Sequence, residues 1–280
     1  DLLAKQLSKL KIKITLKINL DINEKLSSKV LHVLDVPVKF KNPFNLNKNE
    51  NAKYVKKCLD IGHLLAKKKR ILGLINCPVN KKKIPALKNL GVTEYLAQKK
   101  SKNTIEVMMI YNSFFSVVPL TTHINIKDVS KHLSKKLINE KLISLNKFYI
   151  KVFKKKPNIN ILGLNPHNDE YRMSSEEHRI IIPSIKVLKN KGLKISGPYP
   201  ADTIFSQRKK YNFDVIVGMY HDQVLAPFKA MFKYNAINVT LGLDYLRVSP
   251  DHGVAEDIIK KNKADPTSLI KCVNFISRIK

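Results

Sequence analysis

The feature that most constrains the fold is an alternation of short apolar runs with stretches in which apolar residues recur at helical spacing. The apolar runs have the length of buried strands and are bounded by turn residues, so strands and helices follow one another along the chain. This order predicts an α/β fold with a mostly parallel, doubly wound sheet. The predicted strands are Ile71–Ile75, Glu106–Ile110, Phe114–Leu120, Asn160–Leu164, Phe213–Met219 and Ala236–Leu241, and the predicted helices are Ala52–Lys68, Val129–Phe153, Glu176–Asn190 and Pro266–Ile279.

The length limits the number of domains. At roughly 150 residues per domain, 280 residues predict two domains or one large α/β domain. Residues 1–50 begin with an amphipathic stretch and continue with two alternating stretches, Ile12–Leu20 and Val30–Val38. The chain starts at Asp1 without an initiator Met, so we expect a fragment or a processed form. No fixed-period repeat or long linker is present, and a second domain would have to arise from chain crossings.

The chain carries a large positive charge, which could indicate a nucleic-acid partner or an anionic substrate. The chain has 52 Lys and Arg against 22 Asp and Glu, a formal net charge of +30. Nucleic-acid readers concentrate arginine and stacking aromatics, whereas here six arginines stand among lysines scattered with Asn and Ile. We therefore favour compositional drift in an AT-rich coding genome over nucleic-acid binding. The charge would still attract an anionic substrate.

The sequence also argues against a membrane or a secreted protein. No apolar run approaches the length of a membrane span, and no signal-peptide pattern is present. Cys58, Cys77 and Cys272 are odd in number and form no C-x-x-C pair, which indicates neither a disulfide framework nor a thiolate zinc site. We expect a soluble protein of a reducing, cytoplasmic compartment.

Three predicted strands deliver a histidine just beyond their carboxyl ends. His123 follows Phe114–Leu120, His167 follows Asn160–Leu164, and His221 follows Phe213–Met219. Ligands of open α/β sheets bind at that edge, and three imidazoles with an open fourth position suit a catalytic divalent metal. The alternative is three unrelated loop histidines that make local hydrogen bonds.

Other polar residues lie near the same strand ends. Asp202 stands in a proline-stiffened loop, where it either caps a helix or belongs to the site. Lys229, Asn238 and Arg247 fall on or beside the segment that follows His221. A lysine in so basic a chain is most often a surface residue, but the planar fork of an arginine suits a carboxylate or a phosphate. His252 lies in a His-Gly turn that either is a simple loop or contributes to the site.

These residues stand in motifs that together resemble the 4-hydroxythreonine-4-phosphate dehydrogenase family of pyridoxal phosphate biosynthesis. The motifs keep the order and approximate spacing of that family over nearly the whole chain. They are Cys77-Pro78-Val79-Asn80-Lys81, Thr121-Thr122-His123, Gly163-Leu164-Asn165-Pro166-His167, Gly197-Pro198-Tyr199-Pro200-Ala201-Asp202-Thr203, Met219-Tyr220-His221-Asp222-Gln223, Asn238-Val239-Thr240-Leu241-Gly242-Leu243 and Asp251-His252-Gly253.

The resemblance implies a fold like that of isocitrate and isopropylmalate dehydrogenases, with two α/β/α domains and a cleft between them. Residues 1–105 with 245–280 would form the first domain, on the cofactor side. Residues 106–244 would form the second, with the metal ligands and the dimer contacts. The family forms homodimers in which the partner chain completes the active site, and its opening strand and Gly-rich loop would precede Asp1.

The resemblance also implies the reaction and the residues that serve it. Family members use NAD or NADP to oxidise the 3-hydroxyl of 4-phosphooxy-threonine, and the β-keto acid then loses carbon dioxide to give 3-amino-2-oxopropyl phosphate. A divalent metal, Zn, Co or Mg, would polarise the hydroxyl. The matching positions are His123, His167 and His221 for the metal, Thr93, Lys229, Asn238 and Arg247 for the substrate, Asp202 and Lys229 for catalysis, and His252, Gly253 and Asp257 for the cofactor.

Two departures from the family pattern leave alternatives open. Val92 stands where the family has a histidine beside the substrate phosphate, so a sister enzyme that oxidises threonate or erythronate 4-phosphate is a second reading. Residues 259–262 replace a glycine-bearing stretch, and close backbone approach to a cofactor is harder without glycine. A non-catalytic relative with impaired cofactor binding is therefore a third reading, and a basic nucleic-acid binder a fourth. No residue is identified as the general base.

Overall fold

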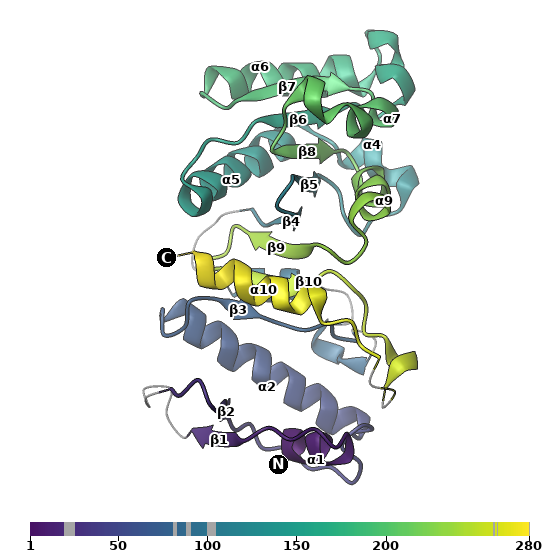
Figure 1. The fold of residues 1–280 in the computed structure, drawn as a ribbon. Coiled ribbons are helices and arrows are strands. Elements are labelled where there is room, and N and C mark those ends of the chain that lie inside the picture. Colours follow the sequence, from purple (N-terminus) through teal and green to yellow (C-terminus); the bar gives the residue numbers. More distant parts are fainter. Residues whose placement is uncertain are drawn as a thin grey trace.

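The computed structural model describes residues 1–19, 26–80, 83–87, 91–99, 105–259, 261 and 263–279. Its centre is one eight-stranded sheet with helices on both faces (Figure 1). The strands, in sheet order, are β3 (Leu74–Ile75), β10 (Arg247–Pro250), β9 (Ile237–Leu241), β4 (Val107–Tyr111), β5 (Ser116–Pro119), β8 (Val215–Gly218), β6 (Ile159–Leu162) and β7 (Ile195–Tyr199).

The sheet is mixed. Strands β5, β8, β6 and β7 pair in parallel, and β3 pairs in parallel with β10. Between these parallel parts, β10, β9, β4 and β5 pair antiparallel. The predicted α/β class is thus confirmed, whereas the expectation of a mostly parallel sheet holds only outside this central part. The strands that precede His123, His167 and His221 are β5, β6 and β8, which are parallel neighbours, so all three carboxyl ends lie at one edge.

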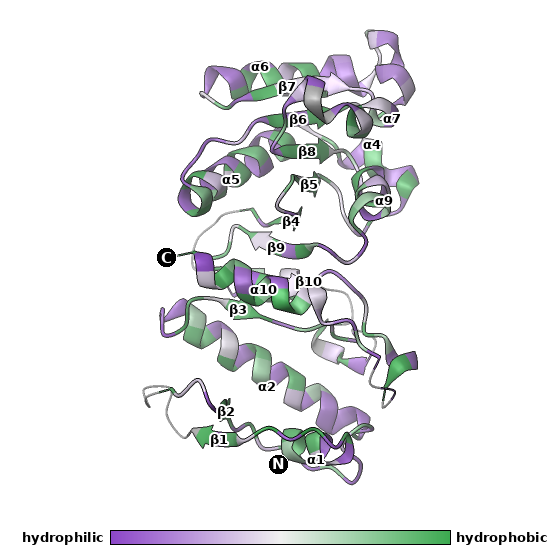
Figure 2. Ribbon diagram, viewed as in Figure 1, coloured by the Kyte–Doolittle hydropathy of each residue, from purple (hydrophilic) through white to green (hydrophobic). Residues whose placement is uncertain are grey.

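Successive side chains of the central strands point to opposite faces of the sheet, and each face carries its own hydrophobic core. In β8, Val215 and Val217 belong to one buried cluster and Ile216 to the other. The first cluster packs under α5 (Lys135–Phe153), α6 (Ile182–Asn190) and α10 (Thr267–Arg278). The second packs under α7 (Ala201–Ile204) and α9 (His221–Phe232). The longer helices are striped with hydrophobic and hydrophilic residues (Figure 2), as expected for helices that bury one face.

A third buried cluster lies beside the β3 end of the sheet. It joins α2 (Lys48–Lys67), the short 3-10 helix Pro85–Leu87 and α3 (Val92–Ala97). Beyond α2, helix α1 (Leu2–Lys9) and a separate parallel pair of strands, β1 (Leu16–Asn19) and β2 (Leu31–Leu34), form the end of the molecule farthest from β7 (Figure 1). The predicted alternating stretches therefore do form strands, but these strands do not join the main sheet.

The structure corrects several predicted elements. The helix predicted over Val129–Phe153 is divided into α4 (Val129–His132) and α5, because Ser134 caps a new helix and accepts a hydrogen bond from Leu137 N at 3.1 Å. The helix predicted from Glu176 begins as a π-helical turn before α6. Strands β7 and β10, the short helix α8 (Arg208–Tyr211) and helices α7 and α9 were not predicted.

The domain boundary and the absence of a membrane span were both predicted from the sequence. The predicted division between residues 106–244 and the rest of the chain falls between β9 and β10, which are neighbours in one sheet, so the two-domain boundary stays a prediction. Within the described residues, no helix is long and apolar enough to cross a membrane.

Candidate active site

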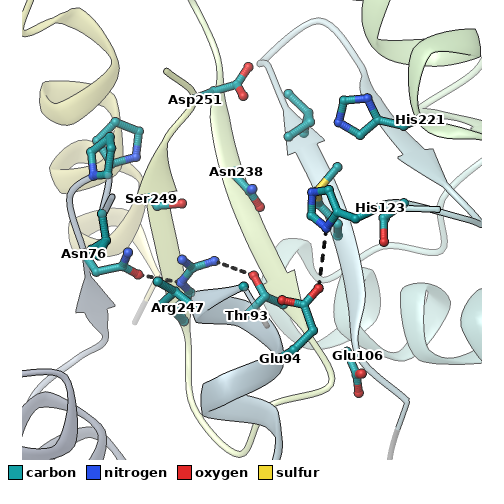
Figure 3. Close-up of a pocket in the computed structure, with 18 of the residues that line it drawn as sticks. Asn76, Thr93, Glu94, Glu106, His123, His221, Asn238, Arg247, Ser249 and Asp251 are labelled. Atoms are coloured by element: carbon teal, nitrogen blue, oxygen red, sulfur yellow. Dashed lines mark hydrogen bonds and ion pairs between the residues drawn. The ribbon is translucent and has the colours of Figure 1, made fainter. Parts of the chain in front are cut away.

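A cavity of about 930 Å³ opens between the β3 end of the sheet and the carboxyl end of β5. Its polar lining comes from segments far apart in the sequence: the loops after β3, β5 and β10, the first turn of α3, the residue before β4, helices α5 and α9, and strands β9 and β10 (Figure 3). Predicted site residues that line it are Thr93, His123, His221, Lys229, Asn238, Arg247, His252 and Gly253. The cavity therefore brings together eight side chains or backbone positions that the sequence had singled out in separate motifs.

Arg247 forms the most buried cationic part of the cavity. Its side chain is only 3% exposed. Its Nε donates to Asn76 Oδ1 at 2.7 Å, and one Nη donates to Thr93 Oγ1 at 3.1 Å and to Thr240 Oγ1 at 2.7 Å. Burial lowers the pKa of Arg247 to about 10, so the guanidinium remains charged at neutral pH. A buried, oriented cation of this kind suits an anionic group.

Asn238 supplies an unused acceptor next to this cation. It lies on β9 and its side chain points into the cavity (Figure 3). Its Oδ1 is buried and accepts no hydrogen bond from any group in the described part of the chain. Because leaving a buried polar atom unpaired costs about 1–3 kcal/mol, the position is suited to a ligand that brings a donor group.

Lys229 and Asp251 form an ion pair on the wall of the cavity. Lys229 Nζ lies 3.2 Å from Asp251 Oδ2, with the lysine side chain 43% exposed and that of the aspartate 10% exposed. Lys229 is on α9, whereas Asp251 directly follows β10 and is fixed by a hydrogen bond from its backbone N to Ser268 Oγ at 2.9 Å. The sequence had assigned Lys229 but had not assigned Asp251.

His123 and His221 lie together, and each has a carboxylate beside Nδ1. Their ring centroids are 6.1 Å apart. Glu94 Oε1 lies 3.7 Å from His123 Nδ1, and Asp222 Oδ1 lies 2.6 Å from His221 Nδ1. A carboxylate at one ring nitrogen orients the imidazole and leaves the other nitrogen for a metal. This pair of residues therefore fits two ligands of a divalent cation.

The third predicted ligand lies elsewhere. His167 is exposed, has a left-handed backbone conformation with φ of 51°, and is not part of the cavity lining. Among the residues that the structure describes, no three His, Cys, Asp or Glu side chains form a group that could hold a metal ion. The ligand set of His123, His167 and His221 thus stays a prediction, with two of its members placed together.

Two further predicted residues lie away from the cavity. Asp202 is exposed in the first turn of α7 and is absent from the lining. Asp257 is exposed in the short 3-10 helix Glu256–Ile258 and is also absent from the lining. Their catalytic and cofactor-binding roles stay predictions.

The His252-Gly253 turn borders an open part of the cavity. A Cβ atom added at Gly253 would meet no heavy atom of the described residues within 4 Å, so among these residues space is available for a ligand to approach this backbone. Val92, where the resemblance predicts a histidine, is 7% exposed and packs in the third buried cluster with α2 and α3 while also lining the cavity. Of the stretch that lacks glycine, residues 260 and 262 lie outside the described residues.

Several lining residues were not found by sequence reasoning. Glu94 directly follows Thr93, and Asp251 directly precedes His252. Their position next to a predicted site residue is the sequence feature that could have identified them. Lys141 carried no such signal, because it stands in a long helix of a lysine-rich chain. Its Nζ donates to Leu120 O at 2.7 Å, just before the loop that carries His123. The other lining residues not predicted include Asn76, Glu106 and Ser249.

Comparison with known proteins gives close relatives by sequence. A 4-hydroxythreonine-4-phosphate dehydrogenase of a Sulfurihydrogenibium species is 38% identical over 216 residues, which are 76% of this chain and 66% of that protein. The protein of the same name from Aquifex aeolicus is 40% identical over 209 residues, 74% of this chain and 64% of that protein. The matched segment thus spans slightly less than two thirds of the length of these curated relatives.

Solved structures agree with the sequence comparison. A crystal structure of 4-hydroxythreonine-4-phosphate dehydrogenase from Klebsiella pneumoniae superimposes with a TM-score of 0.86 at 27% identity, covering 99% of this chain and 85% of the other. A putative enzyme of that name from Salmonella typhimurium gives a TM-score of 0.87 at 27% identity, covering 100% and 87%. The family model described as "Pyridoxal phosphate biosynthetic protein PdxA" matches residues 1–276. With nearly the whole chain matched, the protein belongs to the PdxA family of pyridoxal phosphate biosynthetic proteins.

Proposed function

We propose that this protein is a 4-hydroxythreonine-4-phosphate dehydrogenase, which uses NAD or NADP to oxidise 4-phosphooxy-threonine. The observation that carries the proposal is the convergence of Arg247, Lys229 and Asn238 with His123 and His221 on one cavity. Family membership and the name shared by its relatives support the same reaction. The oxidised product is a β-keto acid, which loses carbon dioxide to give 3-amino-2-oxopropyl phosphate.

The residues of the cavity can hold such a substrate by its charged ends. Arg247 is charged and fixed by Asn76, Thr93 and Thr240, so it binds a phosphate or carboxylate with little reorganisation. Lys229 supplies a second cation from α9. Two fixed cations orient the reacting carbon between them, which lowers the entropic part of the barrier.

A divalent metal fits the histidine side of the cavity. His123 and His221, each with a carboxylate at Nδ1, would hold it. When bound, such a cation polarises the substrate hydroxyl and stabilises negative charge on its oxygen. The choice among Zn, Co and Mg belongs to the proposal and rests on family membership alone.

A homodimer would supply the third ligand. His167 is exposed and lies outside the cavity of its own chain, as expected of a residue that serves a neighbouring copy. We therefore propose that two copies share each active site, with His167 of one copy facing His123 and His221 of the other. Asp202 belongs to the same proposal, because it too is exposed and outside the cavity of its own chain.

The nicotinamide cofactor is assigned to the His252-Gly253 turn, with Asp257 nearby. The open space beside Gly253 supports this assignment, since a cofactor can approach the backbone there.

The test is metal-dependent formation of NADH or NADPH from 4-phosphooxy-threonine, with zinc, cobalt or magnesium added. Turnover that is lost in a His221→Ala variant and retained in a His178→Ala variant supports the proposal, because His178 is exposed and lies outside the cavity. A folded protein that binds NAD or NADP but oxidises no substrate contradicts it. Failure to bind either nucleotide favours a non-catalytic relative.

One observation favours a second substrate class. Val92 stands at the position of a family histidine and is buried against apolar neighbours, so it offers no hydrogen bond to a phosphate. Threonate or erythronate 4-phosphate is the alternative substrate. A comparison of kcat/KM across these three compounds separates the two assignments.

A further inference from the structure

We propose that Asp251 is the general base of this active site, receiving the proton of the substrate hydroxyl on Oδ2 while Lys229 holds its carboxylate in place. The inference rests on the proposed dehydrogenase function and adds a catalytic residue to it. The sequence alone identifies no general base. Three features of the structure support the assignment: a buried oxygen that accepts no hydrogen bond from the described residues, its position in the cavity, and the charges around it.

The first observation is the state of the carboxylate oxygen. The Asp251 side chain is about nine-tenths buried. Lys229 Nζ forms an ion pair with Oδ2 at 3.2 Å but donates its hydrogen bond to the backbone O of Asp251 at 3.5 Å, so no group in the described part of the chain donates a hydrogen bond to Oδ2. A buried oxygen with unused accepting capacity calls for a donor. A substrate hydroxyl is such a donor.

Asp251 Oδ2 belongs to a residue that lines the cavity. Asp251 lines the cavity, at the end of β10, and its carboxylate extends toward the side that carries His221 (Figure 3). Asn238 Oδ1, another buried lining acceptor that receives no hydrogen bond from the described residues, lies between Asp251 and Arg247 (Figure 3). A ligand in this space can therefore place anionic groups on the cations and a hydroxyl on Asp251.

The third observation is the electrostatic balance at Asp251. Burial raises the pKa of its carboxyl, and the Lys229 ammonium offsets that effect only in part. The charged and titratable groups that face it are Lys229 and His221 on α9 and His252 in the same turn, while α10 contributes the Ser268 hydroxyl to its backbone. A raised pKa makes the carboxylate a better proton acceptor than an exposed one, and a base is most effective with a pKa near the working pH.

The proton step can be written in full. The C–H bond of the substrate carbinol breaks, and its hydride passes to the nicotinamide ring, reducing NAD⁺ or NADP⁺ to NADH or NADPH. The O–H bond of the same carbinol breaks, its proton binds Asp251 Oδ2, and a carbonyl double bond forms. The alcohol is oxidised by two electrons, and the proton leaves Asp251 for solvent after release of the products.

An Asp251→Asn variant tests the assignment, because the amide keeps the shape of the side chain and cannot take the proton. We expect kcat to fall by about 10²–10⁴-fold, the usual contribution of a general base, with KM for both substrates changed by less than about threefold. The rise of kcat with pH that reflects ionisation of Asp251 should disappear. The Asp251→Glu variant should regain at least about tenfold of the lost kcat.

Thermal unfolding separates a catalytic role from a structural one. The raised pKa means that ionised Asp251 lowers the stability of the folded protein at neutral pH, so the Asn variant should unfold at the same or a higher temperature. Asp214→Asn is the matched control, since it removes a Lys–Asp pair, Lys155 Nζ to Asp214 Oδ1 at 2.7 Å, outside the cavity. Its kcat should remain within about twofold of wild type.

Three outcomes overturn the assignment. If wild type is active and Asp251→Asn retains kcat within about threefold, Asp251 is not the base. If the Asn variant loses activity together with several degrees of thermal stability, or Asp251→Glu recovers nothing, its role is structural. If the wild-type chain oxidises none of the three phosphorylated acids, the proposed function fails, and this assignment fails with it.

Discussion

Arg247 combines deep burial with a full complement of acceptors on its inner side. Asn76, Thr93 and Thr240 all accept from it, and each comes from a different segment of the chain. Desolvating a guanidinium is costly, and these bonds compensate for part of that cost. The arrangement keeps a cation at a fixed position in the cavity, where a mobile surface arginine would have to be ordered by the ligand.

We expect Arg247→Met to raise the KM for the phosphorylated substrate by about 10- to 100-fold, since a hydrogen bond to a charged group contributes about 1.5–3 kcal/mol. It should also lower thermal stability, because three acceptors lose their donor. Steady-state kinetics and thermal unfolding measure both effects. Arg278→Met, at an exposed arginine near the end of α10, is the control. An unchanged KM in Arg247→Met would remove Arg247 from the substrate site.

Gly253 allows the assigned cofactor position to be tested without disturbing the fold. Because an added Cβ there meets no atom of the described residues within 4 Å, Gly253→Ala should leave the unfolding temperature unchanged and raise the KM for NAD or NADP several-fold. Gly73→Ala gives the opposite case, since its Cβ would lie 2.8 Å from Leu246 O, and it should lower stability. A normal KM for both nucleotides in Gly253→Ala contradicts the assignment.

At the scale of elements, the polar contact between α2 and α3 depends on one carboxylate, that of Asp60. Asp60 on α2 accepts from Tyr95 Oη at 2.5 Å and from Lys56 Nζ at 2.8 Å, and it also pairs with Lys99 Nζ. Burial raises the pKa of Asp60, but these donors outweigh it and lower the pKa to about 2. The stabilisation is therefore present above the unfolded pKa of about 3.9 and is lost as the pH falls through about 2.

Asp60→Asn should accordingly cost about 1 kcal/mol of unfolding free energy at neutral pH, a value reduced by the partial exposure of the pair. The difference from wild type should shrink as the pH falls below about 4 and vanish near pH 2. Urea unfolding across this range measures it. A difference that stays constant with pH would show that the carboxylate charge is not the source of the stability.

A second element-scale feature is the contact between α5 and the end of β5. Lys141 Nζ donates to Leu120 O, and burial lowers the pKa of Lys141, with Glu106 and Glu94 opposing that shift. The native state therefore binds fewer protons than the unfolded state between the lowered pKa and about 10.4. By linkage, stability gains from this group as the pH rises through that window.

Lys141→Met should remove this gain, so its stability relative to wild type should decrease between neutral pH and about pH 10. Lys147→Met on the same helix, where the lysine is exposed, should follow the wild-type curve. Thermal unfolding at a series of pH values measures both. Parallel curves for wild type and Lys141→Met would contradict the prediction.

The elements that could be predicted are those whose local pattern determines them. Strands β5, β6 and β8 are mainly apolar runs buried on both faces, which a sequence shows directly. Strand β10 reads Arg-Val-Ser-Pro and is nonetheless buried along its length, and the Arg247 side chain finds acceptors in the loop after β3, on β9 and on α3. Those partners are distant in sequence, so no local pattern could reveal the strand.

The same physical reason limits prediction of the site. Histidines at the ends of parallel strands were predictable, because parallel neighbours share an edge. Asp251 and Lys141 were not, since their importance comes from burial and from partners on other elements, Lys229 and Leu120. The antiparallel centre of the sheet was also not predictable, because an apolar run does not record its direction.

At the scale of the whole molecule, the arrangement of the three histidines decides how many chains a site needs. His123 and His221 lie together, and His167 is exposed and outside their cavity. If a second copy supplies His167, each active site takes residues from both chains of a symmetric dimer. A variant that lacks only His167 then still carries an intact His123–His221 pair.

Mixing two inactive variants tests whether each active site takes residues from both chains. His167→Ala and His221→Ala chains, unfolded together and refolded at equal amounts, should recover about a quarter of wild-type turnover, because half the dimers are mixed and each mixed dimer has one intact site of two. The same mixture with His123→Ala in place of His167→Ala should recover nothing, since the intact pair is then absent from every chain. Recovery in neither mixture would place all three histidines in one chain, and size-exclusion chromatography would show whether a dimer forms at all.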